Sequence, residues 1–192
     1  MIIRSLALAL CLSALLAAQT NKKETSSLAV LTVCEILANP LQYDGQLIQI
    51  RDVIRGTDEG AWFVGEDCSV FETKDHTWPA LIALEIPGQF PLQLHPVDFQ
   101  FNFESERKIK PKYQQLKRRV TEDCIAWTYT GVFETRKDWA AADAKTIDPG
   151  RPRGFGHANA APAQLIIKSV DDVTAIPKCT PRPKSKRVPV PG

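Results

Sequence analysis

The sequence is poor in features that would each define a class of protein. Its 24 Lys and Arg nearly balance 22 Asp and Glu, leaving a net charge of +2 over 192 residues, which is too small for nucleic-acid binding by charge alone. No apolar run reaches the ~20 residues of a membrane-spanning helix, and no segment repeats. With 44% hydrophobic and 24% charged residues, the chain fits one globular domain rather than a disordered or polytopic membrane protein.

Motifs with a local catalytic signature are also missing. The sequence has no G-x-S-x-G, no H-E-x-x-H and no P-loop, and no two histidines stand at the spacing of roughly three to five residues that metal sites use. The adjacent pair Asp171-Asp172 is typical of a turn. We therefore expect a protein that is not an enzyme and that carries no cofactor or metal. A hydrolase is the less favoured alternative.

Residues 1–19 have the pattern of a secretory signal peptide. Arg4 precedes an apolar run from Leu6 to Leu16, and the small residues Ala17 and Ala18 follow. The run is too short to cross a bilayer, which favours a cleaved leader over an anchor. We expect export to the periplasm or out of the cell, followed by a flexible polar lead over 20–27. A buried N-terminal helix is the alternative.

The predicted export determines whether the cysteines are expected to form disulfides. Of the five in the sequence, Cys11 lies in the leader and four remain after its removal. An even number in an oxidising compartment predicts two disulfides. Three pairings are possible; we expect Cys34–Cys68 and Cys124–Cys179, because each pair would join neighbouring parts of the predicted fold. None lies in a CxxC arrangement, so neither a thioredoxin-like motif nor a zinc knuckle is indicated.

Alternating hydrophobicity predicts a mainly β chain. Thr32 and Glu35 have the spacing of a capping box, which predicts a short helix ended by Asn39-Pro40. The stretch 89–122 is ambiguous: Phe99, Phe101 and Phe103 alternate like a strand, and Glu104 to Asp123 is predicted to be a helix, at least from Pro111. Gly131 indicates a bulge within a long strand. The expected strands cover 46–55, 61–64, 80–86, 124–136 and 164–170.

One segment carries a family resemblance. Tyr43-Asp44-Gly45 precedes Leu47, Ile48 and Ile50, and Arg55-Gly56 follows. This resembles the Y-x-G-x-x-V-x-V-x-G opening of many bacterial OB-like domains, with Thr130-Gly131-Val132-Phe133 as a second glycine-marked strand. The stretch GFGHANAAPAQLIIKSVDDV also looks like segments of uncharacterised exported bacterial proteins.

The order of elements also resembles the OB-fold. The likeness covers Pro40 to Val170. It implies a small five-stranded OB-like Greek-key barrel over 28–176, with one helix before the barrel and one between strands three and four.

In the OB-fold, ligands bind the face of strands two and three, between the first and fourth loops. Here these loops are 56–60 and 137–162. A mixture of rings and cations in the fourth loop could stack on rings and pair with phosphates or carboxylates. The alternative is that its two large aromatic residues fasten the loop to the barrel while the arginines face solvent. The candidate binding residues are Trp139, Arg151, Arg153, Phe155 and His157.

Two further stretches are basic. Seven cations fall between Arg107 and Arg119 and could contact an anionic polymer or lipid head groups. Because acidic residues bracket them, a solvated helix face is the favoured interpretation. The proline-rich stretch 177–192 is predicted to be an extended basic tail.

Together these patterns predict an exported, monomeric, non-catalytic binding module of the cell envelope with no transmembrane anchor. Its contact surface would be the loop 137–162, and its partner an envelope protein or an anionic polymer rather than nucleic acid. The alternative function is an accessory or structural subunit that binds another envelope protein through the barrel edge and the basic helix.

Overall fold

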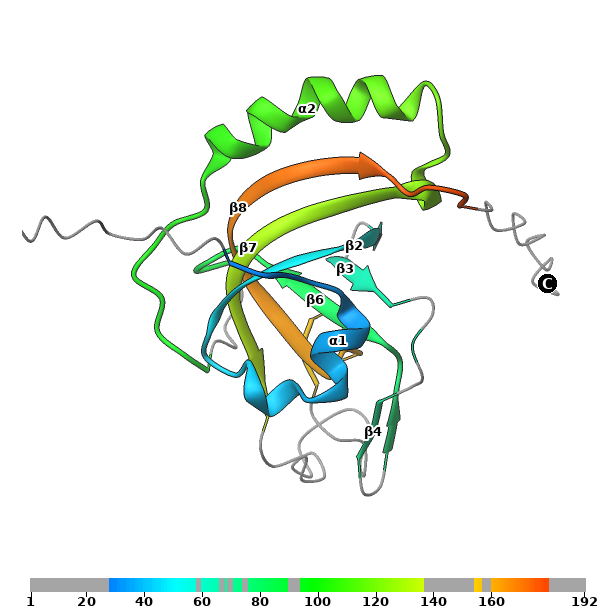
Figure 1. Cartoon of the computed structure of the whole chain (residues 1–192). Coiled ribbons are helices and arrows are strands. Elements are labelled where there is room, and N and C mark those ends of the chain that lie inside the picture. Colours follow the sequence, from blue (N-terminus) through cyan, green and yellow to red (C-terminus); the bar gives the residue numbers. More distant parts are fainter. Residues whose placement is uncertain are drawn as a thin grey trace, which may run out of the picture.

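The protein is described here from a computed structural model, over residues 28–57, 60–65, 68, 71–73, 76–89, 94–136, 154–156 and 160–179. Within these residues it is mainly β, with a mixed sheet of six strands, a two-stranded hairpin and two α-helices (Figure 1). The expected leader over 1–19, the lead over 20–27 and most of the expected tail lie outside the described residues.

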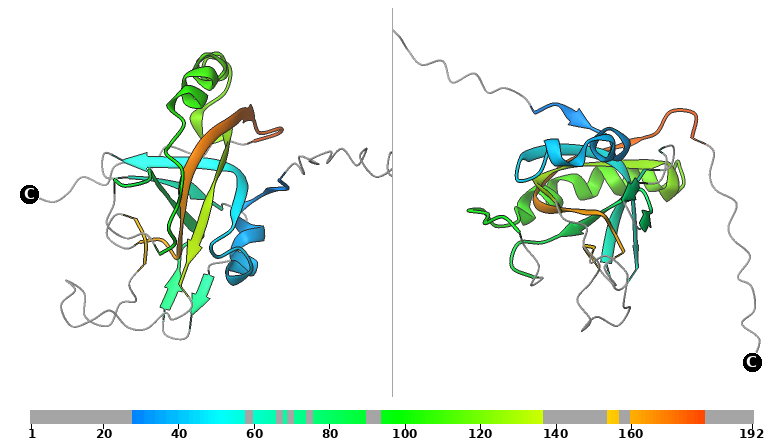
Figure 2. Two further views of the ribbon diagram at one scale, coloured as in Figure 1. Left: turned by 90° about the vertical axis from the view of Figure 1, so that its left-hand side faces the viewer. Right: turned by 90° about the horizontal axis from the view of Figure 1, so that it is seen from below.

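The six-stranded sheet has the order β1-β2-β3-β6-β8-β7, and β2 also pairs with β7. Each of β2, β3, β6, β7 and β8 therefore pairs with two others of that set. The β1–β2 and β6–β8 pairs are parallel, and the remaining pairs are antiparallel. Figure 2 shows β7 and β8 running side by side. The strands are β1 (Val30–Leu31), β2 (Leu47–Thr57), β3 (Gly60–Val64), β6 (Leu81–Glu85), β7 (Ile125–Thr135) and β8 (Ala163–Ala175).

The main core lies between these strands, where their alternating apolar side chains meet. Ile50, Phe63, Ile82, Phe133 and Leu165 each come from a different strand and are fully buried. The expected strands 46–55, 61–64, 80–86 and 124–136 agree with β2, β3, β6 and β7 to within two residues at each end. A hairpin that the sequence did not suggest, β4 (Phe71–Thr73) with β5 (His76–Trp78), lies outside this sheet.

The last strand is longer than expected. We predicted that it ends at Val170 and that Asp171-Asp172 forms a turn, but β8 continues to Ala175. In the register, Thr128 opposes Asp172 and Tyr129 opposes Val170, so Asp171 is the extra residue of a β-bulge. The acidic pair therefore lies within the strand.

The expected capping box is confirmed at the start of α1 (Val33–Ala38). The Thr32 hydroxyl accepts a hydrogen bond from the Glu35 amide, and a Glu35 carboxylate oxygen accepts one from the Thr32 amide at 2.7 Å. The bonds that the Glu35 carboxylate accepts, from the Thr32 amide and from the Thr32 hydroxyl, hold the pKa of Glu35 below its ordinary value. The helix directs Val33, Ile36 and Leu37 into the main core, and a 3-10 turn, η1 (Pro40–Gln42), follows it.

The second helix, α2 (Phe103–Lys117), begins one residue before the expected Glu104 and ends six residues before the expected Asp123. Asn102 caps it, because its side-chain oxygen accepts hydrogen bonds from the amides of the first turn. The alternating phenylalanines are therefore not a strand: Phe101 is buried against β8, whereas Phe103 is 57% exposed. The helix has no fully buried residue, and it lies over β8 (Figure 1).

One of the two expected disulfides is present. Cys124, at the end of the 3-10 turn η2 (Glu122–Cys124), is joined to Cys179, with an S–S distance of 1.98 Å. The bond ties the residues just before β7 to those just after β8. Cys34 and Cys68 are free thiols, and their expected pairing remains a prediction.

Candidate functional site

The structure describes one of the five candidate residues of the loop 137–162. Phe155 is 1% exposed and packs with Ala83, Ala161, Trp62 and Leu81. Two backbone hydrogen bonds join it to Ala161, with N–O distances of 2.8 and 3.1 Å. It fastens the end of the loop to β3 and β6, as the anchoring alternative expects. Trp139, Arg151, Arg153 and His157 lie outside the described residues.

The residue after Phe155 has to be glycine for two reasons. Gly156 has a φ of +69°, which L-residues with a side chain rarely adopt. A Cβ at this position would also stand 2.9 Å from the Cβ of Ala83 and 3.2 Å from Nε1 of Trp62. Gly156 thus lets the loop main chain approach the outer face of β3 and β6 closely.

Two buried polar atoms lie beneath this contact. Trp62 on β3 is opposite Ala83 on β6, and Glu85, two residues further along β6, lies on the same face. The Nε1 of Trp62 and the Oε2 of Glu85 have no hydrogen-bond partner among the described residues. Both side chains lie within 4 Å of the point where a Cβ on Gly156 would stand. A donor and an acceptor are therefore left unpaired at one place, although such atoms are nearly always paired in folded proteins.

Burial also changes the acidity of this site. Glu85 is 5% exposed, and the burial raises the pKa of its carboxyl group to about 7, because a low dielectric penalises the charged form. Near neutral pH the side chain is therefore a mixture of two forms. The neutral form can donate a hydrogen bond, whereas the ionised form can only accept one. We call Trp62, Glu85 and Gly156 the β3–β6 site.

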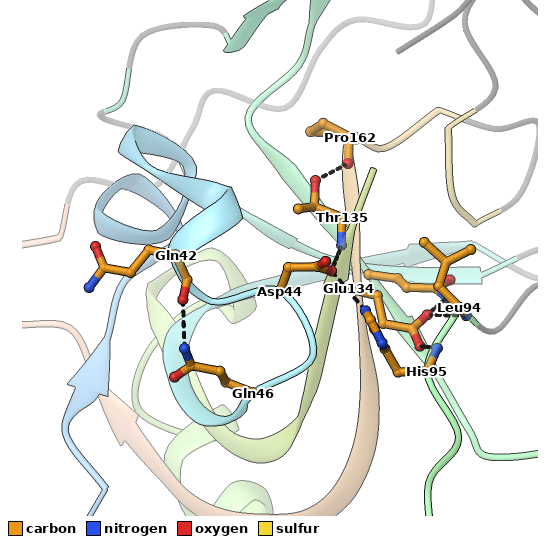
Figure 3. Close-up of polar contacts among 9 residues, drawn as sticks. Gln42, Asp44, Gln46, Leu94, His95, Glu134, Thr135 and Pro162 are labelled. Atoms are coloured by element: carbon orange, nitrogen blue, oxygen red, sulfur yellow. Dashed lines mark hydrogen bonds and ion pairs between the residues drawn. The ribbon is translucent and has the colours of Figure 1, made fainter. Parts of the chain in front are cut away.

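A second buried carboxylate lies on β7, and its hydrogen-bond partners are present. Glu134 on β7 is fully buried and accepts hydrogen bonds from the main-chain amides of Leu94 and His95, at 3.1 and 2.7 Å, and from the Gln164 side chain (Figure 3). Asp44 accepts bonds from the Thr135 amide and lies 3.1 Å from the His95 ring. This cluster fastens the segment before α2 to the sheet, which is a structural role.

The basic stretch of α2 is ion-paired in part. Three of its seven cations contact carboxylates: Arg107 pairs with Glu104, Lys112 with Asp172, and Lys117 with Glu122. These contacts are consistent with the solvated helix face that the bracketing acidic residues indicated. Within the residues that the structure describes, no cluster of three or more His, Cys, Asp or Glu could hold a metal ion.

Among the described residues, no helix is both long and apolar enough to span a membrane. No protein-family model, no curated protein and no solved structure matches the chain.

The resemblance in the sequence indicated the face of the second and third strands, but it did not bring Trp62 and Glu85 together there. Trp62 and Phe63 are adjacent aromatic residues, and nothing in the local pattern tells which of them faces the core; the structure puts Phe63 there. Glu85 ends an apolar strand and looks like an ordinary surface carboxylate. The glycine at 156, between an aromatic residue and a histidine, was the available signal of a close main-chain approach.

Proposed function

We propose that the protein is an exported, non-catalytic binding module of the cell envelope, built on an OB-like Greek-key barrel. Three observations support the barrel. Five strands each pair with two others, β7 returns to lie beside β2, the first of the five, and α2 lies between the third and fourth, β6 and β7. The helix that precedes the barrel is then α1.

Export is supported by the covalent chemistry. The Cys124–Cys179 bond belongs to oxidising compartments, since cytosolic reductants keep thiols reduced. The leader pattern over 1–19 agrees with this.

The β3–β6 site carries the proposal for binding. In the proposed barrel, β3 and β6 are strands two and three, the strands whose face binds ligands in OB-folds. Trp62 comes from one and Glu85 from the other, and the end of the loop 137–162 lies against both through Gly156. The unpaired donor and acceptor at this place are what a ligand would satisfy on binding.

The two unpaired atoms, Nε1 of Trp62 and Oε2 of Glu85, indicate which chemical group of a ligand would bind there. The indole N–H of Trp62 requires an acceptor, and the ionised Glu85 requires a donor. A carboxamide supplies both, since its carbonyl can accept from Trp62 while its N–H donates to Glu85. Acetamido groups of N-acetylated sugars and peptide amides both have this chemistry. Arg151 and Arg153 would then take an anionic part of the same ligand.

The test is thermal stabilisation by probes that differ in the carboxamide. Chitotriose carries acetamido groups, cellotriose of the same length has none, and an N-acetylated, amidated trialanine presents the same chemistry on a peptide. At about pH 8, where Glu85 is ionised, chitotriose or the peptide should raise the Tm of the protein in a saturable way, and cellotriose should not. The stabilising probe identifies the source.

Conservative variants separate the site from general binding. Trp62→Phe removes the N–H and Glu85→Gln removes the ionisable acceptor, and each should abolish the stabilisation. Glu72→Gln, at an exposed carboxylate on β4, is the matched control and should behave like the unaltered protein. Equal stabilisation of all four proteins, or of none by any probe, contradicts the proposal.

A second candidate function has one observation in its favour. The edge strand β1 and the residues that flank it or lie on its partner strand β2 expose three large apolar side chains, each at least 38% accessible: Leu28, Val30 and Leu47. Such an edge suits an accessory subunit that binds another envelope protein. Val30→Lys should then abolish co-purification of that protein, whereas Trp62→Phe should leave it unchanged.

A further inference from the structure

The two free cysteines meet where α1 contacts the chain that leaves β3. Cys34 is the second residue of α1, and Cys68 follows β3 by four residues. Both are half-buried, and Cys68 packs against the main core. The Cys34 thiol is close enough to the Cys68 thiol to contribute to its raised pKa. Residues 34 positions apart in the sequence therefore place their sulfur atoms beside each other.

The surroundings hold the Cys68 sulfur in this position. Its thiol donates a hydrogen bond to the carbonyl oxygen of Gly65, with an S–O distance of 3.4 Å. A Cβ on Gly65 would stand 2.3 Å from that sulfur and 2.9 Å from a methyl carbon of Val33. Glycine at 65 thus lets the main chain after β3, the Cys68 thiol and the start of α1 come together.

The same place is anchored on the sheet. The Val33 amide donates a hydrogen bond to the Asp52 carboxylate on β2 at 3.1 Å, and the Gly65 amide donates one to the Ala80 carbonyl at 2.9 Å. Each cysteine is therefore attached to a segment that is fixed at its neighbouring residues.

We propose that Cys34 and Cys68 are a site of disulfide formation, which fastens α1 to the connection after β3 when the protein meets a disulfide oxidant. This bond is additional to Cys124–Cys179, and it does not depend on the proposed ligand binding.

The reaction is thiol–disulfide exchange with a small-molecule or protein disulfide as oxidant. The Cys34 thiolate attacks one sulfur of the oxidant's disulfide, forms a mixed disulfide and releases a thiolate. The Cys68 thiolate then attacks Cys34 Sγ and releases the second thiolate. The two cysteines lose two electrons and two protons together, and the oxidant's disulfide is reduced to two thiols.

The order of the steps follows from the surroundings of Cys68. Burial, the neighbouring Cys34 and the charge of Asp52 raise the pKa of the Cys68 thiol to about 12. It is therefore the poorer first nucleophile, since only the thiolate attacks. Cys34 begins the exchange, and Cys68 completes it within the molecule.

The test uses the full chain with Cys11 replaced by Ser, so that four cysteines remain. The protein is incubated with oxidised glutathione, unfolded in denaturant with an alkylating reagent, and digested for peptide mapping. We expect no alkylated cysteine and a linked peptide pair containing Cys34 and Cys68. Without the oxidant, both should be alkylated while Cys124 and Cys179 stay protected.

Two variants distinguish the mechanism from other pairings. In Cys68→Ser, Cys34 should accumulate as a mixed disulfide with glutathione, because the second step is lost. In Cys34→Ser, the glutathione adduct on Cys68 should form about tenfold more slowly than the adduct on Cys34 forms in Cys68→Ser, because burial and the charge of Asp52 still disfavour the Cys68 thiolate. The oxidised protein should also melt several degrees above the double serine variant, which retains Cys124–Cys179.

Three outcomes would overturn the proposal. One is that Cys34 and Cys68 remain alkylatable after oxidation. Another is that the peptide map links either of them to Cys124 or Cys179. A third is that Cys34 forms a bond between two copies of the chain, seen as a dimer on a non-reducing gel.

Discussion

Gly131 on β7 lies so close to Ile166 on β8 that a Cβ on the glycine would stand 2.3 Å from the Ile166 carbonyl oxygen. The register between the two strands shifts at this point, between Thr130 and Gly131. The irregularity predicted at Gly131 is therefore present, and the residue left without a partner in the register is Lys168 on β8.

Replacing Gly131 with alanine should destabilise the protein by about 2–3 kcal/mol, because the methyl group forces β7 and β8 apart. Urea unfolding measures this free energy. Gly88→Ala is the control: Gly88 has a φ of +78° but no atom within 4 Å of a Cβ, so it should lose only about 1 kcal/mol. Equal losses would show that backbone conformation, rather than the close contact, matters at Gly131.

Glu134→Gln should cost about 2 kcal/mol of stability. The buried carboxylate accepts bonds from two main-chain amides and from Gln164, and an amide side chain would turn an N–H₂ group toward one of these donors. Hydrogen exchange of the Leu94 and His95 amides should accelerate in this variant. Glu72→Gln, at an exposed position, should leave both measurements unchanged.

The free energy of unfolding should fall as the pH rises through the range in which Glu85 ionises. Burial raises the pKa of Glu85 from 4.5 in the unfolded chain to about 7 in the folded protein, with no charged neighbour among its causes. Between these values the folded state binds more protons than the unfolded state, so the unfolding free energy decreases with pH. The loss is on the order of 3 kcal/mol.

Urea unfolding at about pH 5 and pH 8 measures this loss. Glu85→Gln should remove that part of the pH dependence. If the variant and the unaltered protein show the same slope, Glu85 is not the buried acid described here.

Replacing Asp172 with asparagine should weaken the attachment of α2 to β8. Burial opposes the ionisation of Asp172, but the bond from Lys112, the Val173 amide and the charge of Arg51 outweigh it and hold the pKa of Asp172 below its ordinary value. The ion pair therefore contributes stability at neutral pH that is lost as the pH falls below about 4.

Since this pair is partly exposed, the effect is small, about 0.5–1 kcal/mol. It should appear as a roughly two- to fivefold faster hydrogen exchange of the α2 amides. Asp98→Asn, at an exposed position, is the control. An unchanged exchange rate would mean that Tyr113 and its stacking on Trp127, at 4.7 Å between ring centroids, hold the helix alone.

The elements that were predicted correctly depend on local patterns. The capping box at Thr32 and Glu35 and the alternation along β2 and β7 are complete within a few residues of sequence. The failures arise where distant residues decide the conformation. Asp171 resembles a turn residue, but it lies in β8 because Thr130 and Gln49 donate hydrogen bonds to its carboxylate.

The same limit applies to the candidate site. The loop 137–162 was recognisable by its composition, and the role of Phe155 as an anchor was one of two alternatives for it. The pairing of Trp62 with Ala83, which brings Glu85 and Gly156 to the same face, depends on the strand register. No local feature of the sequence fixes that register.

The most direct measurement is the indole N–H resonance of Trp62, one of four tryptophans, in ¹⁵N-labelled protein titrated with the stabilising probe. Trp62→Phe assigns the signal. The account predicts that this resonance shifts in a saturable way, and that Glu85→Gln abolishes the shift. A Trp62 resonance that stays in place while the probe binds and moves the signal of Trp127 or Trp78 would contradict it.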